Sequence, residues 1–562
     1  MNTSDFAPNN GAVVGTPSPP TRRTVLDDAH VGDIRGALGT LKQHGDAPRS
    51  RKRRLLALLA VMGPGLIVMV GDNDAGGVAT YAQAGQNYGL TLLWTLVLLI
   101  PVLIVNQEMV VRLGAVTGVG HARLIIERFG KFWGAFSVGD LFILNFLTIV
   151  TEFIGVSLAL GYFGVSKYIA VPVAAVALIT MTLTGSFRRW ERLMCLFVVT
   201  NFLAIPLALM SHPHVGAVLS HVFKPGVQGG FSSTSVLLII AIVGTTVAPW
   251  QLFFQQSNVI DKRITPRWIN YERADTVIGS IVVIVGAAAL MIAAASAFGG
   301  THLHGQFGDA GQVATGISHT LGHTAGSVFA IVLLNASIIG AAAVTLASSY
   351  AFGDVFRKPH SLHHGIGRAN AFHASYAAMV LLAAAIVLIP DAPLGTITTA
   401  VQALAGVLLP SATVFLLLLC NDKDVLGPWT NPGWLNAIAS AIVGVLVVLS
   451  AILTATVLFP QIDVTRFSEV LFGVLACGLA GAGVYVARGR IFPLSVPAGG
   501  RLPKQPTSDI GPRDSWTMPQ LELLDRPVWS RTRKIGMLTL RGYLVVAVLM
   551  LIVKAIEVGV GH

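Results

Sequence analysis

Long apolar runs separated by short polar loops make up most of the chain after residue 54. A helix that crosses the hydrocarbon core of a bilayer needs about 20 apolar residues. The expected spans are residues 55–88, 90–111, 133–162, 168–185, 193–210, 233–262, 275–298, 325–353, 370–390, 395–419, 434–459, 467–488 and 540–558. This pattern predicts an all-α polytopic membrane protein with the lipid bilayer as its surroundings.

Lysine and arginine are distributed unevenly between alternate loops of this arrangement, as expected if basic residues concentrate on the cytoplasmic side. The loops expected inside carry Arg112, Arg123, Arg128, Lys131, Arg188, Arg189, Arg192, Lys262, Arg263, Arg267, Arg273, Arg357, Lys358, Arg368 and Lys423. The loops expected outside carry Lys167, Lys224 and Arg466. With the basic run at residues 49–54, this predicts a multi-pass protein of the inner membrane whose N-terminus is cytoplasmic.

Composition agrees with a membrane protein and narrows the function. Of the 562 residues, 53% are hydrophobic and 12% are charged, and the mean hydropathy is +0.70. The net charge of +11 is explained by the loops and tails, so no nucleic acid partner is expected. The sequence contains no GxxxxGK[ST], HExxH or GxSxG pattern, which argues against an ATP-driven pump or an enzyme.

The spans and the polar segments divide the chain into six parts. The first 54 residues are polar and rich in Pro, Ser, Gly and Asn, which predicts a disordered cytosolic tail. The last apolar run is either a further span or an interfacial helix. The expected parts are the tail 1–54, a five-helix unit 55–210, a second one 231–419, accessory spans 434–488, a cytosolic polar segment 489–538, and the possible span 540–558.

The first span is interrupted by polar and flexible residues in its middle. Asp72 and Asp74 lie there between Gly71 and the pair at residues 76–77. Glycine favours an unwound backbone, and a carboxylate at membrane depth costs several kcal/mol unless it faces a cavity, a cation or a partner. The pattern therefore predicts a broken helix with a functional acid. Asp72 is expected either as a second charge at the outer mouth or as a helix-end acid.

The sixth span is interrupted at Pro249, which cannot donate a backbone hydrogen bond and clashes with the preceding turn. Thr245, Thr246, Trp250 and Gln251 add polarity around it. Pro249 alone would indicate a plain kink. Spans one and six begin two successive groups of five, and breaks at matching places in two halves indicate a binding site at the membrane midplane.

At these residues the sequence resembles the Nramp family of divalent metal transporters. The family's first helix carries GPGxxxxxGxxDPGNxAT, matched here by GPG at 63–65, Gly71, Asp74 to Gly77, and Ala79 with Thr80. Its other motifs resemble QEMVVRLGAVTG at 107–118, TEFIG at 151–155, VQALAGVLLP at 401–410 and DVLG at 424–427. The resemblance covers roughly residues 55–460 and implies a leucine-transporter-type fold, a 5+5 inverted repeat with broken helices 1 and 6 and two or three extra C-terminal helices.

The resemblance implies a metal site made of the Asp74 carboxylate, the Gln402 side chain and the Thr245 carbonyl. Two family ligands are replaced, because the Asn of DPGN is Gly77 and the Met of the sixth-helix MPH motif is Ala248. A thioether favours soft transition metals, whereas oxygen and water suit Mg²⁺, Ca²⁺ or Mn²⁺. Mg²⁺ usually keeps several waters, so the two small residues provide the room that such an ion needs.

The groups linked to proton coupling in the family are also depleted. Its two sixth-helix histidines align with Trp250 and Gln255, and a third-helix Asp aligns with Ile149. Glu152 remains, either as an acid facing the cavity or as one hydrogen-bonded between helices. Trp250 is expected to wall the cavity or simply to pack. This pattern resembles the Nramp-related magnesium transporters, and that resemblance implies transport without proton coupling.

We therefore expect a secondary transporter that carries Mg²⁺, with Mn²⁺ as a second substrate, by alternating access and without protons. No resident cofactor is expected, and the sequence leaves the oligomeric state open, a monomer included. One alternative is a proton-coupled Mn²⁺ or Fe²⁺ importer. Others are a metal-sensing or channel-like membrane protein and a carrier of organic substrates, although an acid at the first break would repel carboxylates.

Overall fold

The computed structural model describes residues 28–43, 50–459 and 461–491 and isolated positions between 513 and 545. Its regular elements are α-helices, short 3-10 helices and one two-stranded hairpin. In chain order they are η1 Asp28–His30, β1 Ile34–Gly36, β2 Gly39–Leu41, α1 Arg51–Val61, α2 Pro64–Val70, α3 Ala75–Tyr88, α4 Leu93–Thr117, α5 His121–Phe129, α6 Lys131–Tyr162, α7 Lys167–Thr182, α8 Phe187–Asn201, α9 Ala204–Met210, α10 Val215–Phe223, α11 Ser233–Thr246, α12 Pro249–Asp261, η2 Pro266–Trp268, α13 Ile269–Phe298, α14 Ala310–Leu321, α15 His323–Phe356, α16 Asn370–Val387, α17 Leu394–Cys420, α18 Lys423–Leu426, η3 Gly427–Trp429, α19 Gly433–Leu458 and α20 Val464–Ile491.

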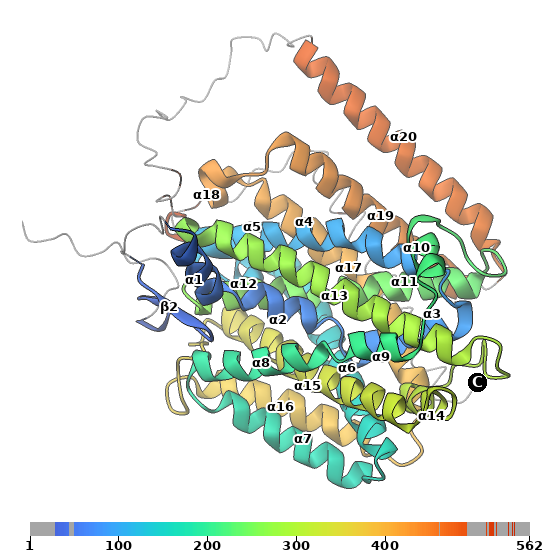
Figure 1. Ribbon diagram of the computed structural model, residues 1–562. Helices are drawn as coiled ribbons and strands as arrows, with labels where there is room; N and C mark the ends of the chain where they lie inside the picture. Colours follow the sequence, from blue (N-terminus) through green and yellow to red (C-terminus); the bar gives the residue numbers. More distant parts are fainter. Residues whose placement is uncertain are drawn as a thin grey trace, which may run out of the picture.

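The long helices form one bundle and cross it side by side (Figure 1). Within the described residues, ten helices are long and apolar enough to span a membrane, and α7 is a shorter apolar helix. α13 packs against α2, α3 and α4, while α6 packs against α15 and α11 against α17. Each expected span between residues 55 and 488 corresponds to one of these helices or to a broken helix, so the predicted all-α polytopic architecture is confirmed.

The two groups of five spans each begin with an interrupted helix. The first span is divided into α1, α2 and α3, and the sixth into α11 and α12. α1 and α2 form an angle of 53° at a break near Gly63, an interruption beyond the one expected at Gly71. The predicted leucine-transporter-type arrangement, with helices 1 and 6 broken, is therefore present. The accessory helices α19 and α20 follow the second group, and α20 lies outside the bundle and diverges from it toward its C-terminal end (Figure 1).

The expectation of a disordered tail over residues 1–54 is wrong for residues 28–43, which fold into η1 and the β1–β2 hairpin. We call these residues the N-terminal strap. The Ala37 N–H donates to Glu191 Oε2 at 2.5 Å, and Arg263 Nε donates to the Ala29 carbonyl at 2.8 Å. The strap is ordered by these tertiary contacts, which a local reading of its polar sequence does not include. α1 also begins within the expected tail, and residues 1–27 lie outside the described part.

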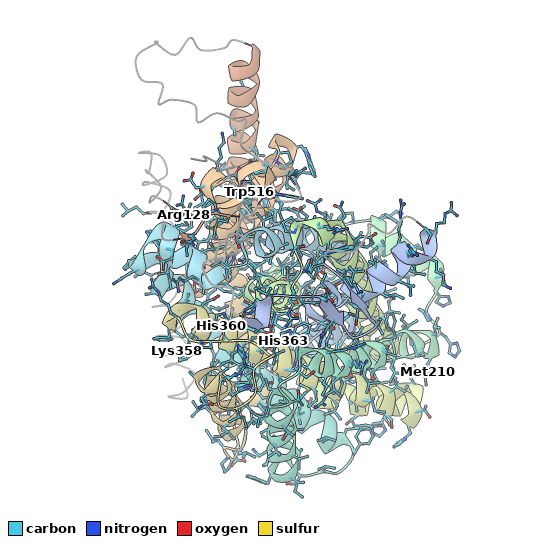
Figure 2. The ribbon with its side chains drawn as sticks, turned by 90° about the vertical axis from the view of Figure 1, so that its left-hand side faces the viewer. Arg128, Met210, Lys358, His360, His363 and Trp516 are labelled. Carbon is cyan, nitrogen blue, oxygen red and sulfur yellow. The ribbon has the colours of Figure 1, made fainter. Side chains whose placement is uncertain are left out.

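The basic loops expected on one side gather at the end of the bundle that carries the strap, here called the strap end. Arg128 of α5 pairs with Asp422 at 2.7 Å and with Asp424 of α18 at 3.0 Å. Arg357 pairs with Glu127 at 2.8 Å, which joins the loop after α15 to α5. Figure 2 looks onto this end and shows Arg128, Lys358, His360 and His363 there. Most of the segments 489–538 and 540–558 lies outside the described residues.

The strap offers a test of its own docking. A Cβ atom at Gly36 would overlap the Ala60 carbonyl oxygen of α1 and lie 3.2 Å from Lys262 Cε. We expect Gly36→Leu to weaken docking by about 1–3 kcal/mol, the usual cost of overpacking. Amide hydrogen exchange of residues 28–43 should then rise by about tenfold or more, because local opening sets the exchange rate.

Leu38→Ala is the matched control, since the Leu38 side chain is 58% exposed and its loss should leave exchange unchanged. If exchange in the strap were the same in Gly36→Leu and in the unmodified chain, the strap would not be docked as described.

Candidate functional site

The first span is interrupted at residues 71–74, between α2 and α3. The Asp74 carboxylate caps α3 and accepts a hydrogen bond of 2.7 Å from the Gly77 N–H. Asp is a preferred N-cap residue, because its oxygen satisfies a free backbone N–H and the positive end of the helix dipole favours its charge. Asn73 Nδ2 donates to the Val283 carbonyl of α13 at 3.1 Å. These contacts fix Asp74 inside the bundle, where it is 3% exposed.

The second interruption lies between Thr246, the last residue of α11, and Pro249, the first residue of α12. Pro249 has no N–H to donate to the carbonyl of Thr245, four residues earlier, so that carbonyl loses its usual helical partner. Ala248 is extended at φ −81° and ψ 145° and caps α12 without a side-chain hydrogen bond. The predicted carbonyl ligand is therefore at a genuine helix break.

The two interruptions lie beside each other. The Tyr81 hydroxyl of α3 and Thr246 Oγ1 are hydrogen-bonded at 2.8 Å. A Cβ atom at Gly77 would lie 3.3 Å from Thr245 Oγ1, so the start of α3 contacts the end of α11. Gly77 of the first broken helix and Thr245 of the second, both expected at the site, therefore lie close together.

Gln402 of α17 reaches the same place. A Cβ atom at Gly76 would overlap the Gln402 amide and would lie 3.3 Å from Asp74 Oδ1. Glycine at this position therefore leaves the space in which the Gln402 side chain approaches the capping carboxylate. Gln402 is 3% exposed, so its amide is presented to the interior of the bundle.

Glu152 of α6 lies next to Asp74. Its Oε2 accepts a hydrogen bond of 3.1 Å from the Ala75 N–H, which leaves its Oε1 buried without a partner among the described residues. A Cβ atom at Gly340 of α15 would lie 2.7 Å from Glu152 Cδ and 2.8 Å from Asp74 Cβ. Gly340 therefore provides the room that keeps the two acids together. Glu152 of α6 thus bonds to the start of α3 and lies beside Asp74.

Asp72 is fully buried, and neither of its carboxylate oxygens has a hydrogen bond of good geometry within the described part of the chain. Gln251 of α12 is its polar neighbour. The Gln251 amide accepts a hydrogen bond of 3.1 Å from Gln107 of α4. Asp72 is thus buried beside the Gln251 amide, which Gln107 holds in place.

Trp250 walls the first break and also packs. Its ring approaches Gly71, where a Cβ atom would lie 3.4 Å from the indole, and it meets Phe254 edge to face at a centroid distance of 5.8 Å. The indole N–H is buried without a hydrogen-bond partner in the described structure. A wall of this kind excludes water from one side of the break.

The structure brings together the residues that the sequence singled out, whereas metal binding by them stays a prediction. Around the two breaks it places Asp72, Asp74, Gly77, Glu152, Thr245, Ala248, Trp250, Gln251 and Gln402. Gly76 and Gly340 were not expected as site residues. Gly76 lies inside the first-helix motif, but Gly340 lies in an alanine-rich run that carries no signal of its own.

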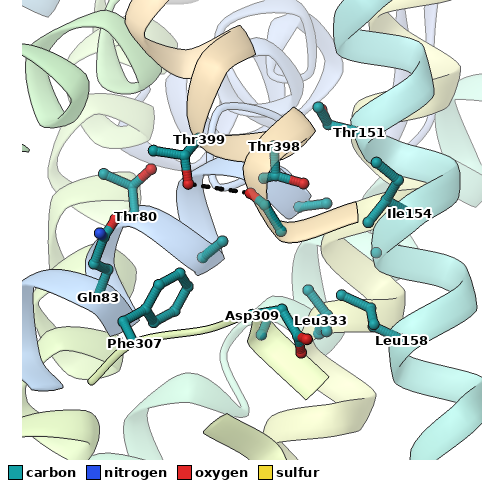
Figure 3. A pocket seen from close by; sticks show the side chains of 15 residues that line it. Thr80, Gln83, Thr151, Ile154, Leu158, Phe307, Asp309, Leu333, Thr398 and Thr399 are labelled. Atoms are coloured by element: carbon teal, nitrogen blue, oxygen red, sulfur yellow. Dashed lines mark hydrogen bonds between the residues drawn. The ribbon is translucent and has the colours of Figure 1, made fainter. Parts of the chain in front are cut away.

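The site is closed toward both ends of the bundle, since Asp72, Asp74, Glu152 and Gln402 are at most 3% exposed. A narrow pocket begins beside Ala75 on the side away from the strap, and Figure 3 shows its polar lining from Thr80, Thr151, Asp309 and Thr398. Its enclosed volume of about 10 Å³ is close to that of one water-sized sphere. An ion can therefore reach or leave the site only after the helices move.

The donors available here are few and are oxygen atoms. Among the described residues, no group of three or more His, Cys, Asp or Glu side chains is arranged to hold a metal ion. A cation near Asp74 would therefore depend on the Gln402 amide, the Thr245 carbonyl and water as well as on carboxylates. Such a set suits a hard, partly hydrated dication.

A bundle of apolar spans with two adjacent helix breaks around a buried acid defines a polytopic membrane protein of the transporter type. The chain belongs to the Nramp family, described as natural resistance-associated macrophage protein-like, whose model matches residues 65–456. It is 26% identical over 439 residues to the divalent metal cation transporter MntH of Staphylococcus aureus strain Mu3, covering 73% of this chain and 93% of that protein. The protein of strain JH9 is 25% identical over the same length.

The fold is also similar to solved structures. The manganese transporter of Eremococcus coleocola, in complex with an aromatic bis-isothiourea substituted compound, has a TM-score of 0.59 and 19% identity. That comparison covers 79% of this chain and 96% of the other. A mutant form of the same transporter has a TM-score of 0.58. At this identity the likeness establishes the fold alone.

The space at Gly340 can be tested by substitution. In Gly340→Ala the new methyl group would press on Glu152 and Asp74, and we expect a loss of about 1–3 kcal/mol in stability from overpacking. Thermal unfolding of the purified protein in detergent measures this change.

Gly139→Ala is the control, because Gly139 also lies inside a long helix but a Cβ atom there would meet nothing within 4 Å. The close approach described at Gly340 would be wrong if the two alanine variants unfolded at the same temperature.

Proposed function

We propose that this protein is a secondary transporter of divalent metal cations, with Mg²⁺ and also Mn²⁺ as cargo, that works by alternating access without proton coupling. The single observation that carries the proposal is the buried Asp74 carboxylate at the junction of the two broken helices, next to the Thr245 and Gln402 positions. The names of relatives, a divalent metal cation transporter and a manganese transporter, support a metal cargo.

The choice of a hard ion follows from the donor set. Asp74, Gln402 and the Thr245 carbonyl offer oxygen, while Gly77 and Ala248 offer no side-chain donor. Without a thioether, the site has no ligand that prefers soft transition metals. Mg²⁺ loses its waters reluctantly and is bound by few carboxylates with several waters retained, which matches a site with two small residues.

The orientation gives the ion a driving force. We infer that the strap end faces the cytoplasm of the inner membrane, because the basic loops gather there. A membrane potential negative inside then favours inward movement of a dication by about 4.6 kcal/mol per 100 mV, twice the value for one charge. Uptake down this gradient needs no protons.

A proton-coupled Mn²⁺ or Fe²⁺ importer is the second candidate, and Glu152 favours it. Its carboxylate lies beside Asp74 and has one oxygen without a partner in the described structure, so it is a possible proton acceptor. Against this candidate, Trp250, Gln255 and Ile149 cannot titrate near neutral pH, and they occupy the positions at which the family resemblance places His, His and Asp.

Three features argue for a transporter over the other classes. The near-complete burial of Asp74 and Gln402 means that no open pore passes the site, unlike a channel. A carrier of amino acids or other carboxylates would have to place an anion against Asp72 and Asp74. Sensing without transport would not require two broken spans that meet at one acid.

The oligomeric state stays open, with a monomer sufficient for the site as described.

The charge of Asp74 can be separated from its capping role. Asn caps helices as well as Asp does, so Asp74→Asn should keep the start of α3 while removing the carboxylate. We expect both Asp74→Asn and Asp74→Ala to reduce Mg²⁺ and Mn²⁺ influx into proteoliposomes to background. Asp463→Asn serves as a control on an exposed carboxylate, 58% accessible, and should transport normally.

The same vesicles, loaded with a pH-sensitive dye, test coupling. Influx with an unchanged internal pH supports the uncoupled proposal. Acidification in step with metal influx, lost in Glu152→Gln, would instead establish the proton-coupled importer. Full influx through Asp74→Asn would refute the role of the charge itself.

Ion preference should respond to a sulfur at position 248. We expect Ala248→Met to raise Cd²⁺ or Fe²⁺ flux relative to Mg²⁺ by about tenfold, the effect of about 1.4 kcal/mol in relative affinity. Ala248→Leu has similar volume without sulfur and separates the ligand effect from loss of space. An unchanged preference in Ala248→Met would contradict the argument from the missing thioether.

A further inference from the structure

A second cluster of buried charges lies toward the strap end of the ion site. It consists of Glu191 of α8, Lys262 after α12, and Glu272 and Asp275 of α13, each at most 1% exposed. Lys262 Nζ lies 2.5 Å from Glu191 Oε1 and donates to the Met62 carbonyl at 2.8 Å. The lysine is hydrogen-bonded to Glu191, and its charge also acts on Glu272 and Asp275. Neither of these two acids has a cation hydrogen-bonded to it among the described residues.

Several oxygens of this cluster are buried without a hydrogen bond in the described part of the chain. They are both carboxylate oxygens of Glu272, Oδ1 of Asp275 and Oε1 of Gln255. Gln255 is held in place, because its Nε2 donates to Thr276 Oγ1 at 3.1 Å, and its side chain neighbours Glu272. Buried carboxylates are normally paired or bound to a metal, since removing a charge from water is costly.

These donors match one kind of ligand. Two carboxylates and an amide are hard oxygen donors, which suit Mg²⁺, Mn²⁺ or Ca²⁺ rather than soft metals. The two carboxylates together carry a charge of −2 when ionised, which a single dication neutralises. A monovalent cation would leave one negative charge buried.

The cluster is connected to the ion site by α12 and α2. Gln251 and Gln255 are four residues apart, so they lie on one face of α12, about 6 Å from each other along the helix axis. Gln251 neighbours Asp72, and Gln255 neighbours Glu272. The seven residues of α2 span about 10 Å between the two sites. Each of the two acids therefore has an amide of α12 beside it, and the two amides lie on the same face of that helix.

We propose that Glu272, Asp275 and Gln255 form a second binding station for the divalent cation, between the ion site and the strap end. The inference rests on the proposed transport function and adds a residue set to it. Asp275 Oδ2 also accepts hydrogen bonds from the Gly63 N–H at 2.9 Å and the Gly65 N–H at 2.8 Å, at the start of α2. A cation at the station competes for this carboxylate, so its arrival loosens the attachment of α2 to α13.

The experiment uses the full-length protein in detergent and counts bound Mn²⁺ by electron paramagnetic resonance. Asp74→Ala removes the first site, so the Mn²⁺ still bound reports the station. We expect Asp74→Ala to bind one Mn²⁺ per chain and the Asp74→Ala, Glu272→Gln double variant to bind none. Adding Glu127→Gln instead should leave binding unchanged, because Glu127 pairs with Arg357 away from the cluster.

The Mn²⁺ flux per folded chain gives a second measurement. A residue needed only for folding would leave this flux unchanged. In proteoliposomes, Glu272→Gln should lower the maximal Mn²⁺ flux at least fivefold, with the half-saturating external concentration unchanged. Glu272→Asp, which keeps the charge, should restore most of the flux. A role in folding alone would instead lower the yield of monodisperse protein for Glu272→Gln and leave the flux per folded chain unchanged.

The outcomes separate the station from the transport function. If the unmodified protein carries Mn²⁺ and Asp74→Ala does not, the transport proposal holds whatever happens at the station. The station is overturned if Asp74→Ala binds no Mn²⁺, or if its bound Mn²⁺ persists after Glu272→Gln. Absence of flux through the unmodified protein would overturn the transport proposal, while the binding counts would still decide whether the second site exists.

Discussion

The structure depends on one constraint, which is that the Asp74 carboxylate is buried inside an apolar bundle. The positive end of α3, the Gly77 N–H and the neighbouring polar groups compensate part of the cost of burying it. A continuous first helix would use that N–H in its own ladder and would leave the acid without this partner. The break in the helix and the acid therefore require each other, which explains why they coincide in the sequence.

The remaining helices are arranged so that this acid has neighbours. α11 must end where α3 begins, and Pro249 ensures that it does. Gly76 of α3 has no side chain, and the Gln402 side chain of α17 occupies the space this leaves. Gly340 of α15 likewise leaves space for Glu152 of α6 and for Asp74. Small residues thus determine the chemistry of the site indirectly, through the groups that they admit.

Local signals in the sequence predicted the parts of the structure that depend on local physics. Helix breaks follow from Gly71 and Pro249, and spans follow from apolar length, so both were predictable and are confirmed. The N-terminal strap was not, because its order comes from contacts such as Ala37 with Glu191, about 150 residues away. Gly340 and the Glu272 cluster were missed for the same reason, since their meaning lies in which distant side chains they meet.

The placement of charged and amide side chains along α2 connects the ion site with the second cluster. In the proposed transport cycle, a dication that leaves Asp74 toward the strap end crosses about 10 Å of protein interior, and burying its charge along an apolar path would be very costly. Asp72 with Gln251, and then Glu272 with Gln255, divide that distance into short steps between oxygen donors. Lys262 is hydrogen-bonded to Glu191, while its charge also acts on Glu272 and Asp275, so the charge of these two acids is only partly offset. Along such a path the carboxylates act as oxygen ligands, and their negative charge favours a divalent over a monovalent cation.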